Sequence, residues 1–395
     1  MKRRALAADT ALSRIRGDIA DLETENIALL AERAGSIEDV ITLWYGESDV
    51  VTPAFIRQAA KDSLDQGETF YVPEMAARPD LARELSRYQS ELHGVNIGLD
   101  RSTVAPGGMQ AVIIALELIV DKGSNVVYLE PQWPNIRHAI QIAGGEARPV
   151  PLDYVEGDWR LDLDRLFDAC DARTKAIMFS TPSNPCGWTA SPEEQQALLE
   201  FSRETGVWII SDEVYNRLYF HGPSAPSMMR LAGEEDLVMC INGFSKAWAM
   251  TGWRLGWLNH PASVAPAVRA MTQYMNSGTP PFVQAGALTA LRDGEDFVRS
   301  VRDRCAQGLS VVYERLGRSN RIRLSNKPKG GMYAFFSVDE ADSASAVCAR
   351  LLEEAHVGLA PGHLFGETSK DFIRMCVCND PELLEEACRR IEAVM

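Results

Sequence analysis

A lysine preceded by a serine and followed eight residues later by an arginine is the feature of this sequence with the clearest chemical meaning. Lys246 lies in the segment NGFSKAW (242–248), and Arg254 lies in TGWRLG (251–256). Burial lowers the pKa of an ammonium group, and only the neutral amine attacks an aldehyde, so a lysine in such small and apolar company suits Schiff-base chemistry. Ser245 and Arg254 suit an anionic group on the same ligand, most simply a phosphate.

One ligand that combines an aldehyde with a phosphate is pyridoxal 5'-phosphate, and we take it as the predicted cofactor. A single lysine is most often a solvated surface charge. The prediction therefore depends on whether the rest of the chain supplies the other parts of such a site.

Composition limits the classes of protein to which the chain could belong. Its 395 residues allow a large core and either several domains or one large α/β domain with a smaller one. The formal net charge of -15 argues against nucleic acid or an anionic membrane as a main partner. The sequence contains no apolar run long enough to predict a membrane-spanning helix.

The cysteines and the start of the chain indicate a cellular location. None of the eight cysteines forms a C-x-x-C pair, which favours reduced thiols over a disulfide framework or a metal site. MKRR at the start is followed by ADTALSR and not by the apolar stretch of a signal peptide. We expect a cytoplasmic enzyme or binding protein without a metal.

Short apolar runs alternate with helical patterns through the middle of the chain, which predicts an α/β fold with a mainly parallel sheet. The predicted strands lie at 126–129, 176–180, 207–211 and 237–241. A helix should begin after Ser191, where Pro192 and Glu194 complete a capping-box pattern. Strands at 330–336 and 372–377, with helices near 343–355 and from Asp380, predict a smaller α/β layer. The polar, helical segment up to about residue 40 is expected to pack on this layer.

Polar residues directly after the predicted strands are candidates for the site, because ligands of open α/β sheets bind beyond the carboxyl ends of the strands. Asp212 could keep a pyridine nitrogen protonated, which makes the ring an electron sink. Asn184 and Tyr215 could share the phenolic oxygen of the cofactor, and Trp133 offers a flat surface for ring stacking. Taken alone, Asp212 could equally cap a turn, and Trp133 could be a core residue.

Two further patterns suit anionic groups. Gly107 and Gly108 allow the backbone to approach a ligand, and the apolar helix after them would direct free N–H groups at a phosphate. A plain strand-to-helix turn is the alternative interpretation of this Gly-Gly pair. Arg374 lies in a predicted strand, where a charge needs a partner, and a substrate carboxylate is a natural one.

In these motifs and their order, the sequence resembles the class I/II aminotransferases, the aspartate-aminotransferase-like group of fold type I pyridoxal phosphate enzymes. The resemblance runs from about Leu43 to the C-terminus. It implies a three-layer large domain (47–285) and a small domain built from 1–46 and 286–395. It also implies a cytoplasmic homodimer with the active site at the interface. The implied activity is ping-pong transfer of the α-amino group of an amino acid to a 2-oxo acid.

The resemblance also implies a role for each matching residue. Lys246 would form the Schiff base and shuttle the proton, Asp212 would pair with the pyridine nitrogen, and Trp133 would stack on the ring. Asn184 and Tyr215 would bind the phenolic oxygen, and Arg374 with the backbone of Gly46 would bind the substrate carboxylate. The residues implied for the phosphate are Gly108, Met109, Gln110, Ser245, Arg254 and, from the neighbouring subunit, Tyr71.

The sequence departs from the family pattern at two places. The segment EMAAR (74–78) is one residue longer than the family's loop after the tyrosine that matches Tyr71. Met109 stands where relatives often have a hydroxyl or a lysine that binds a dicarboxylate substrate. We therefore do not expect a charge at Met109 to bind an aspartate or glutamate side chain.

Two other functions remain open from the sequence. A β/γ-elimination lyase or synthase of the same fold would use the same motifs, and its products would distinguish it. A non-catalytic sensor that binds the cofactor is a more remote alternative, because such a protein has no need of Arg374. The substrate is not determined, since Trp44, Tyr45 and Tyr274 could equally line a pocket or belong to the core.

Overall fold

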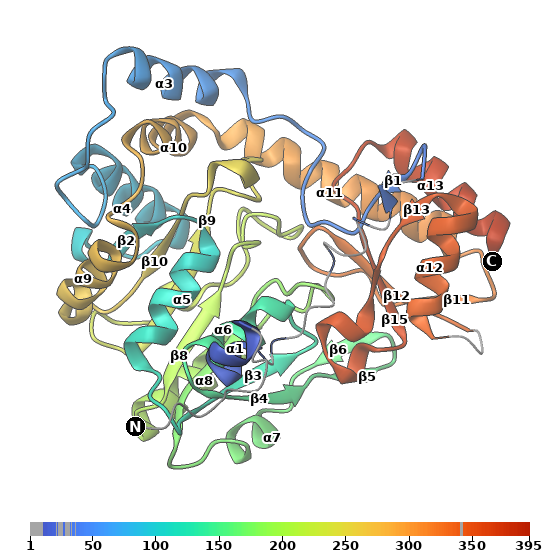
Figure 1. Cartoon of the computed structure of the whole chain (residues 1–395), viewed down its shortest axis with the longest axis horizontal. Coiled ribbons are helices and arrows are strands. Elements are labelled where there is room, and N and C mark those ends of the chain that lie inside the picture. Colours follow the sequence, from blue (N-terminus) through green and yellow to red (C-terminus); the bar gives the residue numbers. More distant parts are fainter. Residues whose placement is uncertain are drawn as a thin grey trace, which may run out of the picture.

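A seven-stranded sheet and a four-stranded sheet organise the chain (Figure 1). The computed structural model describes residues 11–20, 22, 27, 32, 34–35, 37–339 and 343–395. Among these residues, no helix has both the length and the apolar composition needed to cross a membrane.

The seven-stranded sheet has the strand order β2-β10-β9-β8-β7-β3-β4. Its strands are β2 (Ser102–Ala105), β3 (Asn125–Glu130), β4 (Glu146–Pro151), β7 (Thr174–Ser180), β8 (Trp208–Asp212), β9 (Val238–Gly243) and β10 (Gly256–Asn259). Strands β4, β3, β7, β8 and β9 are parallel, and β10 is antiparallel to both of its neighbours. The prediction of a mainly parallel sheet is confirmed, and the four predicted strands are β3, β7, β8 and β9.

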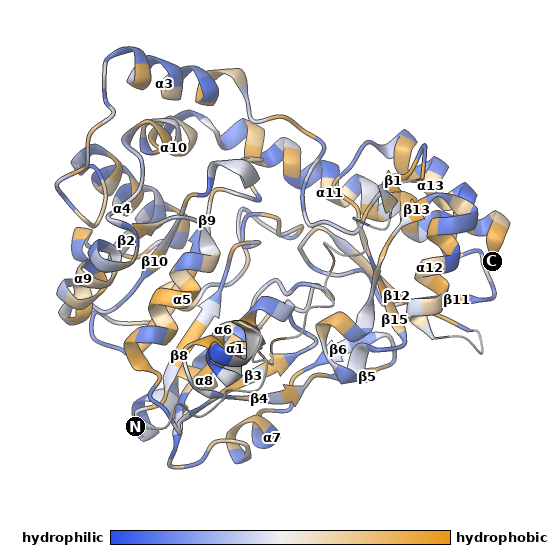
Figure 2. Cartoon of the chain, viewed as in Figure 1, coloured by the Kyte–Doolittle hydropathy of each residue, from blue (hydrophilic) through white to orange (hydrophobic). Residues whose placement is uncertain are grey.

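Helices cover both faces of this sheet, which gives three layers. Val126 and Tyr128 of β3 face the core formed with α5, α6 and α9, whereas Val127 and Leu129 face the core formed with α7 and α8. This alternation reflects the two-residue period of a strand. The helices around the sheet are α3 (Ala54–Asp65), α4 (Pro79–His93), α5 (Gly108–Ile119), α6 (Pro134–Ile142), α7 (Leu163–Asp168), α8 (Pro192–Thr205), α9 (Ala265–Asn276) and α10 (Pro281–Asp293). Figure 2 shows α5 as largely hydrophobic, as expected for a helix packed inside the layers.

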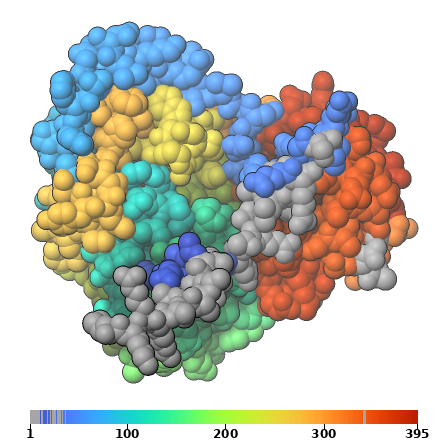
Figure 3. Space-filling model, viewed as in Figure 1, coloured from blue at the N-terminus to red at the C-terminus, as the bar shows by residue number. Residues whose placement is uncertain are grey.

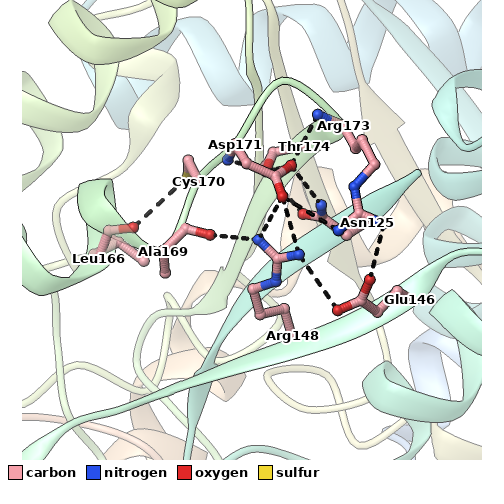
Figure 4. A network of polar contacts seen from close by, with 9 residues as sticks. All are labelled: Asn125, Glu146, Arg148, Leu166, Ala169, Cys170, Asp171, Arg173 and Thr174. Carbon is pink, nitrogen blue, oxygen red and sulfur yellow. Dashed lines mark hydrogen bonds and ion pairs between the residues drawn. The ribbon is translucent and has the colours of Figure 1, made fainter. Parts of the chain in front are cut away.

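The amino ends of the parallel strands are held by a polar network (Figure 4). Asp171 accepts a hydrogen bond from Asn125 Nδ2 at 3.0 Å and from Arg148 Nη1 at 3.2 Å. Thr174 Oγ1 donates to Asn125 Oδ1 at 2.8 Å. Hydrogen bonds, led by that from the Arg173 amide, hold the pKa of Asp171 well below its usual range. These polar groups satisfy one another and hold together the amino ends of β3, β4 and β7.

The four-stranded sheet is antiparallel, with the order β11-β12-β15-β14. Its strands are β11 (Ile322–Leu324), β12 (Tyr333–Val338), β14 (Ala360–Pro361) and β15 (Phe372–Cys376). It shares a core with α11 (Glu295–Leu316), α12 (Ala344–Ala355) and α13 (Pro381–Val394). The predicted small α/β layer is thus present, and Asp380 caps α13 as expected.

The described part of the N-terminal segment contacts two parts of the molecule: a helix of the large sheet and the C-terminal layer. Helix α1 (Gly17–Ala20) lies against α6, and Arg16 Nη2 donates to the carbonyl of Ile142 at 3.1 Å. Figure 3 shows α1 as a dark blue patch on the large sheet's side of the molecule. Ile27 and Val40 instead pack against the C-terminal layer, and β1 (Ile41–Thr42) pairs with β13 (Val357–Gly358). The expectation that the whole segment packs on the C-terminal layer is therefore wrong for α1, whose neighbour is α6.

Candidate active site

A cavity of about 930 Å³ opens where the parallel strands end and the two sheets meet. The strand register places Ser180, the last residue of β7, opposite Asp212, the last residue of β8. The structure brings together these predicted residues as lining of the cavity: Gly46, Gly108, Met109, Trp133, Asn184, Asp212, Tyr215, Ser245, Lys246, Arg254 and Arg374.

Lys246 follows β9 and is half-buried in the cavity wall. Its Nζ donates a 2.5 Å hydrogen bond to the carbonyl of Gly46 and lies 5.5 Å from the centre of the Tyr215 ring. Burial lowers the pKa of Lys246 to about 8. A substantial fraction of this amine is therefore neutral near physiological pH, which is the form that attacks a carbonyl group.

Asp212 is buried at the end of β8. Its carboxylate accepts hydrogen bonds from the Val214 amide at 3.2 Å and from Ser180 Oγ at 3.3 Å. Burial raises the pKa of Asp212 to about 6, against the effect of those two hydrogen bonds. A carboxylate in this setting is stabilised by a cationic partner, such as a protonated ring nitrogen.

Two tyrosines connect the large-sheet side of the cavity to the small sheet. Tyr215 Oη and Tyr333 Oη form a 2.7 Å hydrogen bond, and both side chains are buried. Gly46 fits closely beside this pair, because a Cβ at this position would lie 1.8 Å from Tyr333 Oη. The absence of a side chain at Gly46 is therefore what allows its carbonyl to reach Lys246.

Arg374 is a buried cation in β15, and Phe335 stands opposite it in β12. Its Nη1 donates to Asn184 Oδ1 at 2.7 Å, and its Nη2 donates to the carbonyl of Trp44. The guanidinium carbon lies 4.4 Å from the Tyr333 ring centre. Arg374 Nε is buried without a hydrogen-bond partner in the part of the chain that the structure describes. A buried arginine that faces a cavity without a carboxylate partner suits an anionic ligand.

The turn between β2 and α5 provides a second place for an anion. Gly107 has a φ of 89°, and α5 begins at the next residue, so the first N–H groups of this twelve-residue helix are free of helical partners. A Cβ on Gly107 would lie 2.6 Å from Arg254 Nη2, which shows how closely this guanidinium approaches the turn. Arg254 Nη1 donates to the carbonyl of Thr251 at 2.8 Å. Backbone amides and a fixed guanidinium in this arrangement fit a phosphate.

Three residues considered from the sequence lie away from this cavity. Tyr71 and Tyr274 have exposed fractions of 82% and 86%, and neither lines the cavity. Gln110 also does not line the cavity, and its Nε2 lies 3.6 Å from Met275 Sδ. Tyr45 does line it, whereas Trp44 is a core residue that contributes its backbone carbonyl to Arg374.

Several cavity residues were not anticipated from the sequence. Tyr333 is the most informative of them, since it contacts both Tyr215 and Arg374. Its position two residues after Gly331, within the predicted strand 330–336, was the available signal. Among the others, Leu22, Ile27, His138 and Leu364 reach the cavity through tertiary packing that no local pattern indicates.

Comparisons with known proteins agree with this geometry. Residues 38–391 match the family described as aminotransferase class I and II. The chain is 29% identical to the aspartate aminotransferase of Pyrococcus horikoshii over 378 residues, with 95% of each chain covered. It is 31% identical to aromatic-amino-acid aminotransferase 2 of Thermococcus litoralis, with 93% of this chain and 95% of the relative covered. The structure of Thermus thermophilus aspartate aminotransferase with maleate superposes with a TM-score of 0.89 at 28% identity, covering 96% of this chain and 100% of the other.

The chain therefore belongs to the aminotransferase class I and II family. Its α/β architecture is that of fold type I, and it is an enzyme that transfers amino groups with pyridoxal phosphate as cofactor. The residues around the cavity fit this cofactor: a lysine with a lowered pKa, a buried carboxylate and a glycine turn beside an arginine. The relatives' names include both aspartate and aromatic amino acids, so membership of the family leaves the substrate open.

Proposed function

We propose that Lys246 carries the proton-transfer chemistry of an aminotransferase that moves an α-amino group from an amino acid to a 2-oxo acid in two half-reactions. The observation that carries this proposal is a half-buried lysine with a pKa of about 8 in the same cavity as Asp212 and Arg374. Pyridoxal phosphate, when bound, supplies an aldehyde and a ring that accepts electrons. In this proposal Lys246 Nζ would hold the cofactor through its aldehyde carbon until the substrate amine displaces Nζ from that carbon. The freed Lys246 amine would then take the proton from substrate Cα and deliver it to the same carbon.

The other residues hold the reacting atoms in place. Asp212 pairs with the ring nitrogen, and Asn184 with Tyr215 binds the phenolic oxygen. Trp133 lies flat against the ring. The α5 amino end at Gly108 and Met109, with Ser245 and Arg254, binds the phosphate.

At the substrate end, Arg374 binds the α-carboxylate beside the backbone of Gly46. The free Nε of Arg374 and its contacts with Asn184 and Trp44 support this role. Because Gln110 does not line the cavity, we limit its proposed contribution to its backbone N–H.

We also propose a homodimer with the active site at the interface. Phe70 and Tyr71 are large side chains with exposed fractions of 81% and 82%, and Tyr274 and Met275 are exposed on α9. Such exposure of aromatic groups is typical of surfaces that become covered by a partner. In this proposal Tyr71 reaches the phosphate of the partner subunit. Eight free cysteines, seven of them buried, support a reducing and therefore cytoplasmic location.

The division into a large domain and a small domain remains our proposal. The boundary expected at residue 285 falls inside α10, which packs against α3 and α4. Gly294, between α10 and α11, is a better position for it, since α11 contributes to the core of the small sheet.

The experiment that tests the function is an absorbance titration of the purified protein carrying pyridoxal phosphate against a panel of amino acids. We expect the long-wavelength band of the lysine-bound cofactor to be lost while the band of its aminated form rises. A 2-oxo acid should then restore the first band. Release of pyruvate with ammonia or a thiol, without the aminated form, would instead indicate the elimination reaction.

A further inference from the structure

The cavity extends past the proposed chemical groups along the faces of two helices. On α5, Met109, Val112 and Ile113 are spaced three and four residues apart and line the cavity together. This spacing places them on one side of the helix. All three belong to or pack against the hydrophobic core shared with α6. The α5 side of the cavity is therefore a continuous apolar surface.

Helix α6 presents a matching face. Asn135, His138, Ala139 and Ile142 line the cavity at positions that repeat every three or four residues. Its two polar members are Asn135, which has a short side chain, and His138, whose Nδ1 lies 3.0 Å from Oε1 of Gln141 on the same helix. This wall contains no side chain with a permanent positive charge.

The N-terminal segment adds two more apolar side chains. Leu22 and Ile27 line the same cavity, as does Leu364 from the C-terminal layer. Of the described residues of this segment, those at the cavity are apolar and add no charge to its wall.

The cations that line the cavity already have partners in the proposed site. Among the described lining residues, only Lys246, Arg254 and Arg374 are lysine or arginine. Arg254 lies against the Gly107 turn, and Arg374 contacts Asn184 and Trp44. With Lys246 assigned to the aldehyde, no lysine or arginine remains among them to neutralise a second substrate carboxylate. Within one subunit, a second substrate carboxylate at this wall would be buried without a lysine or arginine partner, which is unfavourable because no ion pair offsets its desolvation.

We propose that the apolar faces of α5 and α6, closed by Leu22 and Ile27, form a side-chain pocket that selects amino donors with an apolar aliphatic or aromatic side chain over dicarboxylic amino acids. This inference rests on the proposed function and names its substrate class. Met109 occupies the position nearest to the proposed phosphate site and is the residue of the wall most able to alter this selection. Its unbranched side chain has nearly the length of a lysine, so a substitution can add a charge without adding bulk.

The first test compares amino acids with the holoenzyme. We expect the second-order rate constant of the absorbance change to be about 100-fold or more higher for L-leucine or L-phenylalanine than for L-aspartate or L-glutamate. Calorimetry with unreactive acids provides a readout that does not depend on turnover. 4-Methylpentanoate or 3-phenylpropanoate should bind more tightly than succinate.

The second test uses a matched pair of variants. Met109→Lys should decrease the preference for L-leucine over L-aspartate by about tenfold or more, because it places a cation in the wall. Met109→Leu keeps the wall apolar and should leave the preference within about threefold of the wild type. The ratio of two substrates on one protein cancels any shared effect on folding or cofactor loading.

The outcomes separate this inference from the function on which it rests. If L-aspartate reacts as fast as L-leucine and succinate binds as tightly as 4-methylpentanoate, the pocket assignment is overturned while the aminotransferase function stands. Equal preferences of Met109→Lys and Met109→Leu would likewise overturn the role of the α5 wall. If no amino acid converts the bound cofactor, the proposed function itself fails.

Discussion

Arg374 Nη1 donates a 2.7 Å hydrogen bond to Asn184 Oδ1, and this contact joins the small antiparallel sheet to the loop after β7 of the large sheet. The two residues are far apart in the chain. Arg374 is proposed to bind the substrate carboxylate, and Asn184 the phenolic oxygen of the cofactor. In the proposed site, a substrate carboxylate at Arg374 would thereby lie at a fixed distance from a cofactor ring bound beside Asn184. The relative position of the two sheets is thus part of the geometry of the site.

Replacing Arg374 tests this arrangement. Arg374→Gln should lower kcat/KM for amino acids by about 100-fold or more, because a buried partner of a charged ligand is removed. Steady-state kinetics with the best donor would measure the loss. Cofactor affinity serves as the internal control and should change little. A KM and kcat equal to those of the wild type would contradict the proposed carboxylate site.

Removing the Lys246 amine should separate cofactor binding from chemistry. We expect Lys246→Ala to lose transamination while it retains part of its affinity for pyridoxal phosphate through the α5 turn and Arg254. Absorbance and equilibrium dialysis would measure the two properties. Arg254→Gln is the complementary variant, with the amine intact and the phosphate site weakened. Full transamination by Lys246→Ala would refute the assignment.

Asp212 gives a prediction for stability against pH. Its pKa is raised to about 6 in the folded protein, so the folded state holds the proton more tightly than the unfolded chain does. The free energy of unfolding therefore falls as the pH rises from the pKa of Asp212 in the unfolded chain to about 6. Above pH 6 the whole of this destabilisation is present. Asp212→Asn should therefore stabilise the cofactor-free protein by up to about 3 kcal/mol at pH 8. Urea unfolding would measure it.

The pH dependence of the stability difference between Asp212→Asn and the wild type serves as the internal control. The gain should shrink as the pH is lowered toward 5, because the wild-type carboxyl then becomes protonated. The same variant should lose most of its transamination activity at every pH. A constant or negative stability difference over this range would show that burial does not dominate at Asp212.

The close approach of Gly46 to Tyr333 predicts that a side chain at residue 46 would disturb the hydrogen bond between Tyr215 and Tyr333. Gly46→Ala would place a Cβ 1.8 Å from Tyr333 Oη, so the Tyr333 side chain or the backbone at residue 46 must shift, which perturbs the hydrogen bond to Tyr215. We expect a loss of about 1–3 kcal/mol in the free energy of unfolding and a lower kcat/KM. Adding Tyr333→Phe should recover part of the stability, since it removes the clashing hydroxyl.

Gly98→Ala is the matched control, because no atom lies within 4 Å of a Cβ built at that position. It should leave both stability and kinetics close to those of the wild type. Equal effects of the two glycine substitutions would show that the close fit at Gly46 has no special role.

The sequence predicted the large sheet and the polar residues beyond the carboxyl ends of its strands well, because both depend on local patterns in the sequence. The four buried strands are continuous apolar runs; Asp212 directly follows one predicted run, and Asn184 lies in the loop after another. Because the carboxyl ends of parallel strands meet at one side of a sheet, the sequence alone predicted that these residues lie close together.

The features that were missed depend on contacts between distant segments. Helix α1 lies on α6 because of tertiary packing, and its polar sequence gave no indication of that neighbour. Tyr333 reaches Tyr215 only through the approach of the small sheet to the large one. The apolar wall likewise needs both α5 and α6, and either helix alone has the pattern of an ordinary core helix.

The faces of α5 and α6 that line the cavity consist of different residues from the strand-end groups proposed to carry the chemistry. A mutation at Ile113 or Ile142 changes the shape of the pocket and leaves Lys246, Asp212 and Arg374 in place. Such a separation allows substrate range to diverge in small steps while catalysis is retained throughout. A library confined to the cavity-facing positions of these two helices would therefore be an efficient starting point for changing the amino donor by directed evolution.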